Sequence, residues 1–248
     1  MFICLIVLLL NNCVEKEKTK QSNQYDTKNI VVNTQFGQFI DKFESLSLPF
    51  KGDLESRNFV KFFNFSDTDQ KAISKVKIPY DDAKKYFFAG VDSLISKSQG
   101  GRFEFFYGYK LPTNGNYFLL FYNRYSNLTS FDYRLATFDL DGILIDDIGI
   151  GGGVNNGGSM DIDVQREFLI NEDYTINIEE VNINNSITSI KDTNDKYLYD
   201  ITRKDIVYTI SNKGTFDIKS EKSLGVLPYY YDEEKTKYIS KNSNSLFR

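Results

Sequence analysis

The sequence predicts an α+β fold that is mostly antiparallel β-sheet. We expect two short N-terminal helices packed on a twisted antiparallel meander sheet or a partial barrel. Apolar residues first recur at helical spacing, and from residue 102 onward they form short runs rich in Phe, Tyr and Leu. Short polar turns join these runs, as in antiparallel meanders. Strands do not alternate with helices, which argues against a parallel sheet.

The first expected helix lies near residue 36. Its apolar face consists of Phe36, Phe39, Ile40 and Phe43. Asn33 or Thr34 supplies a side chain that suits the N-cap position. Because the residue before a proline disfavours helical geometry, we expect the helix to end before Leu48-Pro49.

The second expected helix follows Pro79, with Asp81 or Asp82 as its cap. Its apolar face consists of Ala83, Tyr86, Phe87, Val91 and Leu94. The glycines of the segment 99–101 are expected to end it.

The strands begin with the runs 102–110 and 117–125, in which both faces are apolar. These two runs are therefore expected to be central and covered on both sides. Further strands are expected at 131–140, 174–181, 197–201, 206–210 and 215–218. Polar residues at 203–205 and 212–214 predict turns between the last three of these strands.

Asp141-Gly142 lies between apolar runs and predicts a two-residue hairpin turn. In that register Leu140 pairs with Ile143 and Phe138 pairs with Ile145, all on the core face. The nearby acids then lie on the opposite, solvated face of the hairpin.

Acidic residues cluster in and after this hairpin, so we considered a ligand or metal site there. The acids are Asp139, Asp146, Asp147, Asp161 and Asp163. A calcium-binding EF-hand is excluded because Gly142 at its sixth position would place Thr137 and Ile148 at ligand positions. An irregular carboxylate site and a glycosidase acid pair stay open, but a solvated hairpin face is the favoured interpretation. No catalytic residue, metal ligand or cofactor is assigned.

The segment 149–158 is rich in glycine, but it does not fit a phosphate-binding loop. Dinucleotide spacing would require glycine at position 154, which is Val154. We expect a flexible loop and the best candidate for a lid or binding loop. Farther along, Tyr229, Tyr230 and Tyr231 cannot all point inward from one strand, so at least one ring is expected near the surface. Such a ring suits contact with a protein or a sugar, although filling the core is the favoured role.

Composition excludes several chemistries. The chain has no His or Trp, and its two cysteines, Cys4 and Cys13, lie within the first thirteen residues. Disulfides, Cys/His zinc sites and histidine-dependent catalysis are therefore not expected in the folded body. The net charge of -4 argues against nucleic acid as a partner.

The N-terminus carries a short apolar run, Phe2 to Leu10. A membrane-spanning helix needs roughly 20 residues, so the run is typical of a signal peptide instead. The next residues, Leu10-Asn11-Asn12-Cys13, resemble the lipobox of bacterial lipoproteins at their first and last positions. The resemblance implies a lipid on Cys13, the mature chain's only cysteine, and a location in the bacterial cell envelope, with the outer membrane favoured.

The expected organisation is a signal peptide at 1–12, a polar tether at 13–29, a single α+β domain at 30–232 and a polar tail at 233–248. The expected function is a membrane-tethered, non-enzymatic binding or accessory protein whose partner is a protein or a glycan. Two alternatives stay open: a carboxylate-based hydrolase of glycans and a structural envelope protein. A hydrolase requires converging carboxylates, and a glycan binder requires coplanar exposed rings.

Overall fold

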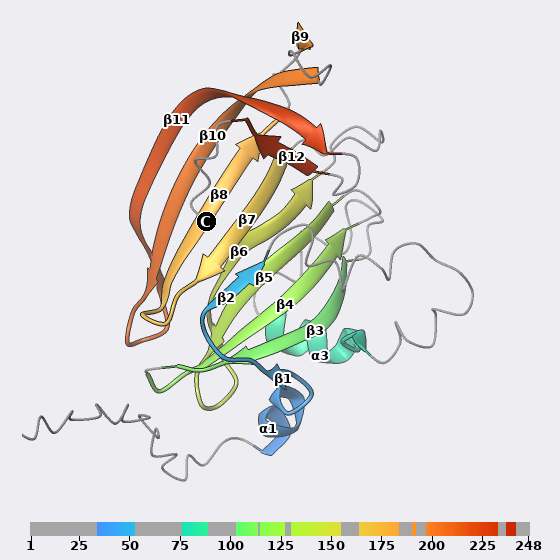
Figure 1. Ribbon diagram of the computed structural model, residues 1–248. Helices are drawn as coiled ribbons and strands as arrows, with labels where there is room; N and C mark the ends of the chain where they lie inside the picture. The colour runs from blue at the N-terminus through green and yellow to red at the C-terminus, as the bar shows by residue number, and fades with distance from the viewer. Residues whose placement is uncertain are drawn as a thin grey trace, which may run out of the picture. The chain divides into compact units, whose positions relative to one another are not determined.

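The computed structural model describes residues 34–52, 76–88, 103–113, 115–126, 130–154, 164–183, 190–191, 197–232 and 237–241. These residues confirm the predicted fold class, an α+β protein built mostly from antiparallel β-sheet with two short helices (Figure 1). The predicted lipidation site, Cys13, and the expected signal peptide and tether lie outside the described residues.

The helices are α1 (Thr34–Ile40) and α3 (Tyr80–Phe87). The strands are β1 (Glu44–Ser45), β2 (Phe50–Gly52), β3 (Phe103–Leu111), β4 (Phe118–Ser126), β5 (Ser130–Phe138), β6 (Leu144–Val154), β7 (Val164–Ile170), β8 (Thr175–Asn182), β9 (Ile190–Lys191), β10 (Tyr197–Ile210), β11 (Phe216–Asp232) and β12 (Lys237–Ser240). The last of these lies within the range expected as a polar tail.

These strands form one open sheet in the order β1-β3-β4-β5-β6-β7-β8-β10-β11-β12. Among the described pairings only β1 with β3 is parallel. Strands β6 and β7 pair at one end alone, where Gly152–Val154 meet Val164–Arg166. At the other end of β7, β2 pairs with Phe168–Ile170 and fills the place that β6 leaves (Figure 1).

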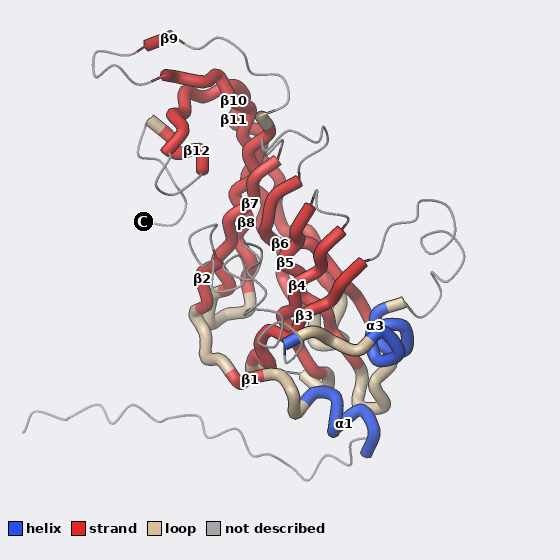
Figure 2. The backbone as a smooth tube through the Cα atoms, turned by 90° about the vertical axis from the view of Figure 1, so that its right-hand side faces the viewer, coloured by secondary structure: helices blue, strands red, loops and turns tan. Residues whose placement is uncertain are grey.

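Strand β4 is covered on both faces, as the sequence predicts. Strand β3, also expected to be central, lies instead next to the sheet edge, where only the two residues of β1 and a bridge from Lys77 pair with it among the described residues. Leu119 and Phe121 point into an inner core that is formed largely by strands β4 to β10, whereas Leu120 and Tyr122 point into a helix-side core with α1 and α3. Figure 2 shows α3 beside β3 and β4. A third core, the C-terminal core, contains Val181, Ile201 and Tyr229. Alternation along β8 and β10 places it on the opposite face from the inner core.

The expected cap of α3 is wrong. Pro79 occupies the N-cap position, and no side chain in the described part of the chain caps the helix by a hydrogen bond. Asp81 and Asp82 lie instead in the first turn, where their charges favour the helix dipole. Val91, Leu94 and the expected end at 99–101 lie outside the described residues. Helix α1 ends at Ile40, before Leu48-Pro49 as expected.

The β5–β6 hairpin has a three-residue loop in place of the predicted two-residue turn. The Asp139 N–H donates to the Ile143 carbonyl at 2.9 Å, and Gly142 has a φ of 86°. This loop pairs Phe138 with Leu144 and leaves Ile143 63% exposed. The predicted common face of Leu140, Ile143 and Ile145 is therefore wrong, because a shift of one residue turns side chains to the other face.

Ionisation of Tyr117 makes the free energy of unfolding depend on pH. Burial, with a smaller contribution from Tyr174, raises the pKa of Tyr117 to about 12. Since the raised pKa favours the neutral folded form, the stabilisation is complete below about pH 10 and is lost as pH rises through about 12. We expect Tyr117→Phe to show a shallower fall of unfolding free energy over this range in urea titrations. Equal slopes for the two proteins would contradict the assignment.

Candidate functional site

The predicted acids of the β5–β6 hairpin do not act together. Asp139 stabilises the hairpin loop in which it lies, because its Oδ1 accepts the N–H of Asp141 at 3.0 Å and that of Ile143 at 2.8 Å. Local bonds of this kind are typical of aspartate in turns. Asp161 and Asp163 lie outside the described residues.

Asp146 joins two hairpins that are distant in sequence. Its Oδ2 accepts the N–H of Phe216 at 2.8 Å, and its Oδ1 accepts the N–H of Asp147 at 2.8 Å. Beside it, the Thr137 hydroxyl donates to the Gly214 carbonyl at 2.6 Å. These bonds fix the β10–β11 turn against the start of β6. Asp146 therefore has a structural role that the sequence pattern does not reveal.

Removal of this carboxylate is expected to destabilise the fold. Asp146→Ala leaves two backbone N–H groups without their acceptor, at a cost of about 1–3 kcal/mol. Asp141→Ala, an exposed acid of the same hairpin, is the control and should change stability by less than about 0.5 kcal/mol. Urea denaturation of both variants measures the difference. A loss that is equal in the two variants would refute the role of Asp146.

Asp147 belongs to an ion network on strands β4, β5 and β6. The Tyr122 hydroxyl donates to Asp147 Oδ2 at 2.9 Å, and Arg134 Nε donates to Asp147 Oδ1 at 3.1 Å. Burial, aided by the negative charge of Asp147, raises the pKa of Tyr122 well above its ordinary value. Tyr122 therefore stays a hydrogen-bond donor throughout the physiological pH range.

The network continues along β4 and β5. Arg124 contacts Asp132 at 2.5 Å, and Arg134 lies 3.9 Å from the same carboxylate. Two arginines thus balance two aspartates, so each carboxylate is held by a cation. Among the residues that the structure describes, no three His, Cys, Asp or Glu side chains come together as a metal site would require. This arrangement suits a structural network better than an acid–base pair.

The glycine-rich segment is partly a strand. Gly149 to Val154 lie in β6, whereas 155–158 lie outside the described residues. The expected flexible loop is therefore wrong for the first half of the segment. A Cβ on Gly151 would lie 2.8 Å from the rings of Tyr133 and Phe168. The glycine is needed because these rings approach the strand closely.

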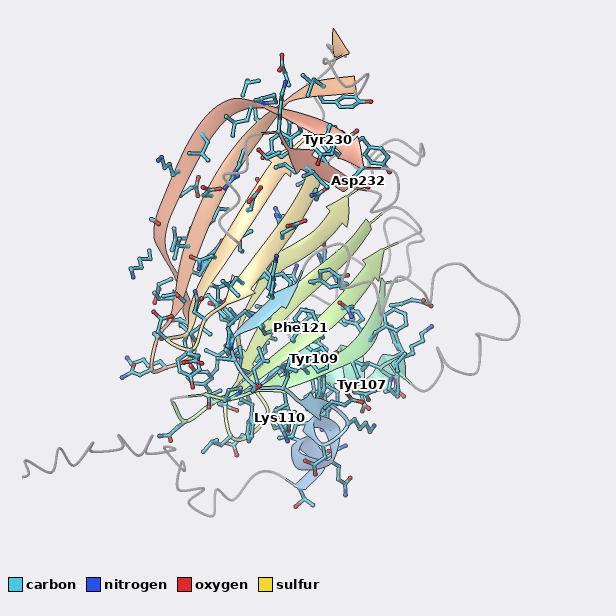
Figure 3. All side chains as sticks on the ribbon, in the orientation of Figure 1. Tyr107, Tyr109, Lys110, Phe121, Tyr230 and Asp232 are labelled. Atoms are coloured by element: carbon cyan, nitrogen blue, oxygen red, sulfur yellow. The ribbon has the colours of Figure 1, made fainter. Side chains whose placement is uncertain are left out.

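The three consecutive tyrosines differ in exposure. Tyr229 is 1% exposed and lies in the C-terminal core, Tyr230 is partly buried, and Tyr231 is 40% exposed. Figure 3 shows Tyr230 at the end of β11, far along the sheet from Tyr109 and Phe121. One ring near the surface is what the sequence predicts.

Tyr231 belongs to a group of three rings, of which Tyr199 and Tyr238 are partly buried and pack against the C-terminal core, whereas Tyr231 is exposed. We call Tyr199, Tyr231 and Tyr238 the tyrosine surface. The ring of Tyr238 is perpendicular to that of Tyr199, with an interplanar angle of 90°, and is tilted by 59° from that of Tyr231. Sugar rings stack on flat aromatic faces, and these rings do not form a coplanar platform. Tyrosines in such a group supply both apolar area and hydroxyl groups.

A buried ion group beneath this end of the sheet was missed by the sequence prediction. Arg203, 1% exposed in its side chain, lies 3.2 Å from Glu179 and 2.8 Å from Asp205. The polar run 203–205 suggested a turn, but these residues lie within the continuous 14-residue strand β10. The predicted turn is wrong because the charges pair across and along the sheet. A polar run without Gly, Pro or Asn is a weak turn signal.

Comparison of the chain with protein-family models, curated proteins and solved structures gives no match. In the described part of the chain, no helix has the length and apolar character needed to cross a membrane.

Asn123 is an unusual polar residue in the interior. It is 6% exposed, and neither polar atom of its amide has a hydrogen-bond partner among the residues that the structure describes. An unsatisfied buried group costs about 1–3 kcal/mol, so Asn123→Leu should raise the unfolding free energy by about 1 kcal/mol. Asn123→Ala, which also leaves a cavity, is the comparison. A less stable Leu variant in urea denaturation would show that the amide is stabilising.

Proposed function

We propose that the chain is a lipid-anchored accessory protein of the bacterial cell envelope that binds a partner protein through the tyrosine surface. The anchor is supported by the short apolar run before Cys13 and the polar segment that follows it. Several acyl chains on one cysteine, each methylene contributing about 0.8 kcal/mol, would hold the protein stably at a membrane.

The observation that carries the binding function is the partial exposure of Tyr231, whose ring contacts that of Tyr238 at a tilt of 59°. Tyrosine is enriched at protein interfaces because it presents a large rigid ring at low entropic cost. The hydrolase alternative has less support, since Asp139, Asp146 and Asp147 are all engaged in turn bonds or ion pairs.

The anchor is tested by labelling cells with radioactive palmitate. We expect incorporation into the full chain and loss of the label in Cys13→Ala. Cys13→Ser, which keeps a similar size and a polar group, should also lose the label. Equal labelling of the wild type and both variants would overturn lipidation of Cys13.

The tyrosine surface is tested by placing a photo-crosslinking amino acid at position 231 in living cells. Position 80 is the control, because Tyr80 is 63% exposed but lies on α3, away from the tyrosine surface. A discrete protein adduct from position 231, lost when Tyr199 and Tyr238 are both changed to Ala, supports the proposal. Adducts of equal yield from both positions, or from neither, would contradict it.

A further inference from the structure

The outer strands of the sheet differ in how their edges are covered. The edge of β3 is occupied twice: Leu46 donates to the Lys110 carbonyl at 3.0 Å, and Ile78 donates to the Phe105 carbonyl at 2.8 Å. The edge of β11 is paired by β12 only from Tyr229 to Asp232. At the start of β11 the Phe216 N–H donates to Asp146, and in the described part of the chain the β11 edge from Asp217 to Leu227 has no strand partner.

This open edge is long and well exposed. The residues from Asp217 to Ser223 are all exposed, and the apolar side chains of Ile218 and Val226 are 57% and 60% exposed. An open row of backbone N–H and C=O groups is a template for another strand. Figure 1 shows β11 as the long outer strand that β12 covers only near its end.

The side chains of the edge restrict which strand can pair with it. Lysines and register irregularities are devices that prevent unselective edge pairing, and β11 has Lys219, Lys222 and two irregularities in its register with β10. A neutral strand would leave these charges facing uncharged groups. A strand with the opposite order of charges would compensate them.

We infer that the β11 edge pairs with the β11 edge of a second copy of this chain, in antiparallel orientation. About a two-fold axis through Ser220, Lys219 of each copy faces Glu221 of the other. No residue from Asp217 to Ser223 then faces a like charge, since Asp217 meets Ser223 and Ile218 meets Lys222. The interface uses the same surface on both copies and therefore closes as a dimer.

Charge inversion tests this pairing. The full chain, purified in mild detergent, is measured by light scattering and native mass spectrometry. Glu221→Lys and Lys219→Glu each place like charges opposite one another, so each should weaken the dimer about tenfold or more. A mixture of the two variants restores both opposite pairs and should form a heterodimer. Lys213→Glu, in the exposed β10–β11 turn, is the charge control and should leave the dimer unchanged.

The register is tested with Ser220→Cys in a chain whose Cys4 and Cys13 are replaced by Ser. Directly opposed residues have Cβ atoms about 4.5–5.5 Å apart, close enough for a disulfide after a small adjustment. We expect a dimer linked through position 220 after mild oxidation, and none from Lys213→Cys.

A wild-type chain that is monomeric at high micromolar concentration would overturn the inference, as would a mixture of the inverted variants without a heterodimer. Equal disulfide yields at positions 220 and 213 would also overturn it, since they would reflect random collision. The inference goes beyond the proposed function. If the chain is a monomer but still crosslinks to a protein through position 231, only the dimer inference is contradicted. If the chain is a dimer but takes up no palmitate, only the proposed lipid anchor is contradicted.

Discussion

Arg203→Met is expected to lower the unfolding free energy by about 3–5 kcal/mol. Arg203 lies between Glu179 and Asp205, whose side chains are 10% and 15% exposed. Without the guanidinium, two carboxylates in a poorly solvated place lose the cation that lies between them. The large effect comes from the carboxylates that lose their counter-charge. The intact buried ion pair itself contributes little to stability when it is compared with apolar residues of the same size.

The neighbouring residue provides a matched control. Lys204, which is 40% exposed, pairs with the exposed Glu221 at 2.9 Å. Lys204→Met should therefore cost less than about 1 kcal/mol. Urea denaturation at neutral pH compares the two variants. A triple variant that changes Arg203 to Met, Glu179 to Gln and Asp205 to Asn should recover part of the loss. Equal costs for Arg203→Met and Lys204→Met would show that the buried ion group does not determine stability.

The parts of the fold that the sequence predicts are those set by local apolar pattern. The two-sided apolar character of β4 follows from Leu119 and Phe121 on one face and Leu120 and Tyr122 on the other. In α1, Phe36, Phe39 and Ile40 recur at helical spacing and are all buried. Burial of large side chains dominates folding energy, so these patterns are reliable guides.

The parts that the sequence does not predict depend on partners distant along the chain. Arg203 extends β10 through a polar run because Glu179, on the neighbouring strand β8, supplies a counter-charge. Asp146 is conspicuous as one acid in a cluster, but its partner Phe216 is 70 residues away. The sequence thus predicts the candidate site only in part. It identifies the acidic residues, but it does not reveal the hydrogen bonds and ion pairs that each of them makes.

The proposed function and the inferred dimer place binding at the C-terminal strands, where β11 is exposed from Asp217 to Ser223. Ion networks and turn bonds account for the acids of β5 and β6. On β11, by contrast, Tyr231 and the residues from Asp217 to Ser223 stay exposed even where they make contacts, such as the ion pair of Glu221 with Lys204. Tyr231 and the edge at Lys219 therefore remain the most informative positions for functional experiments.

Phe36→Ala is expected to lower stability by about 3–5 kcal/mol, as for other buried aromatic rings. Phe36 is 1% exposed, and its ring lies 5.3 Å from that of Tyr86 and 5.4 Å from that of Phe138. It thereby joins α1 to α3 and to the sheet. The turn beside it is shaped by the same ring, because a Cβ on Gly142 would lie 2.5 Å from it.

The exposed Gln38 of the same helix is the control, and Gln38→Ala should change stability by less than about 0.5 kcal/mol. Hydrogen exchange separates two explanations of a loss in Phe36→Ala. If Phe36 supports the whole fold, amides of β4 and β5 exchange faster, because global unfolding becomes easier. If only α1 detaches, faster exchange is confined to α1 and α3. We expect the first result, since Phe36 contacts the ring of the fully buried Phe138 in β5, and the second would limit Phe36 to docking the helix.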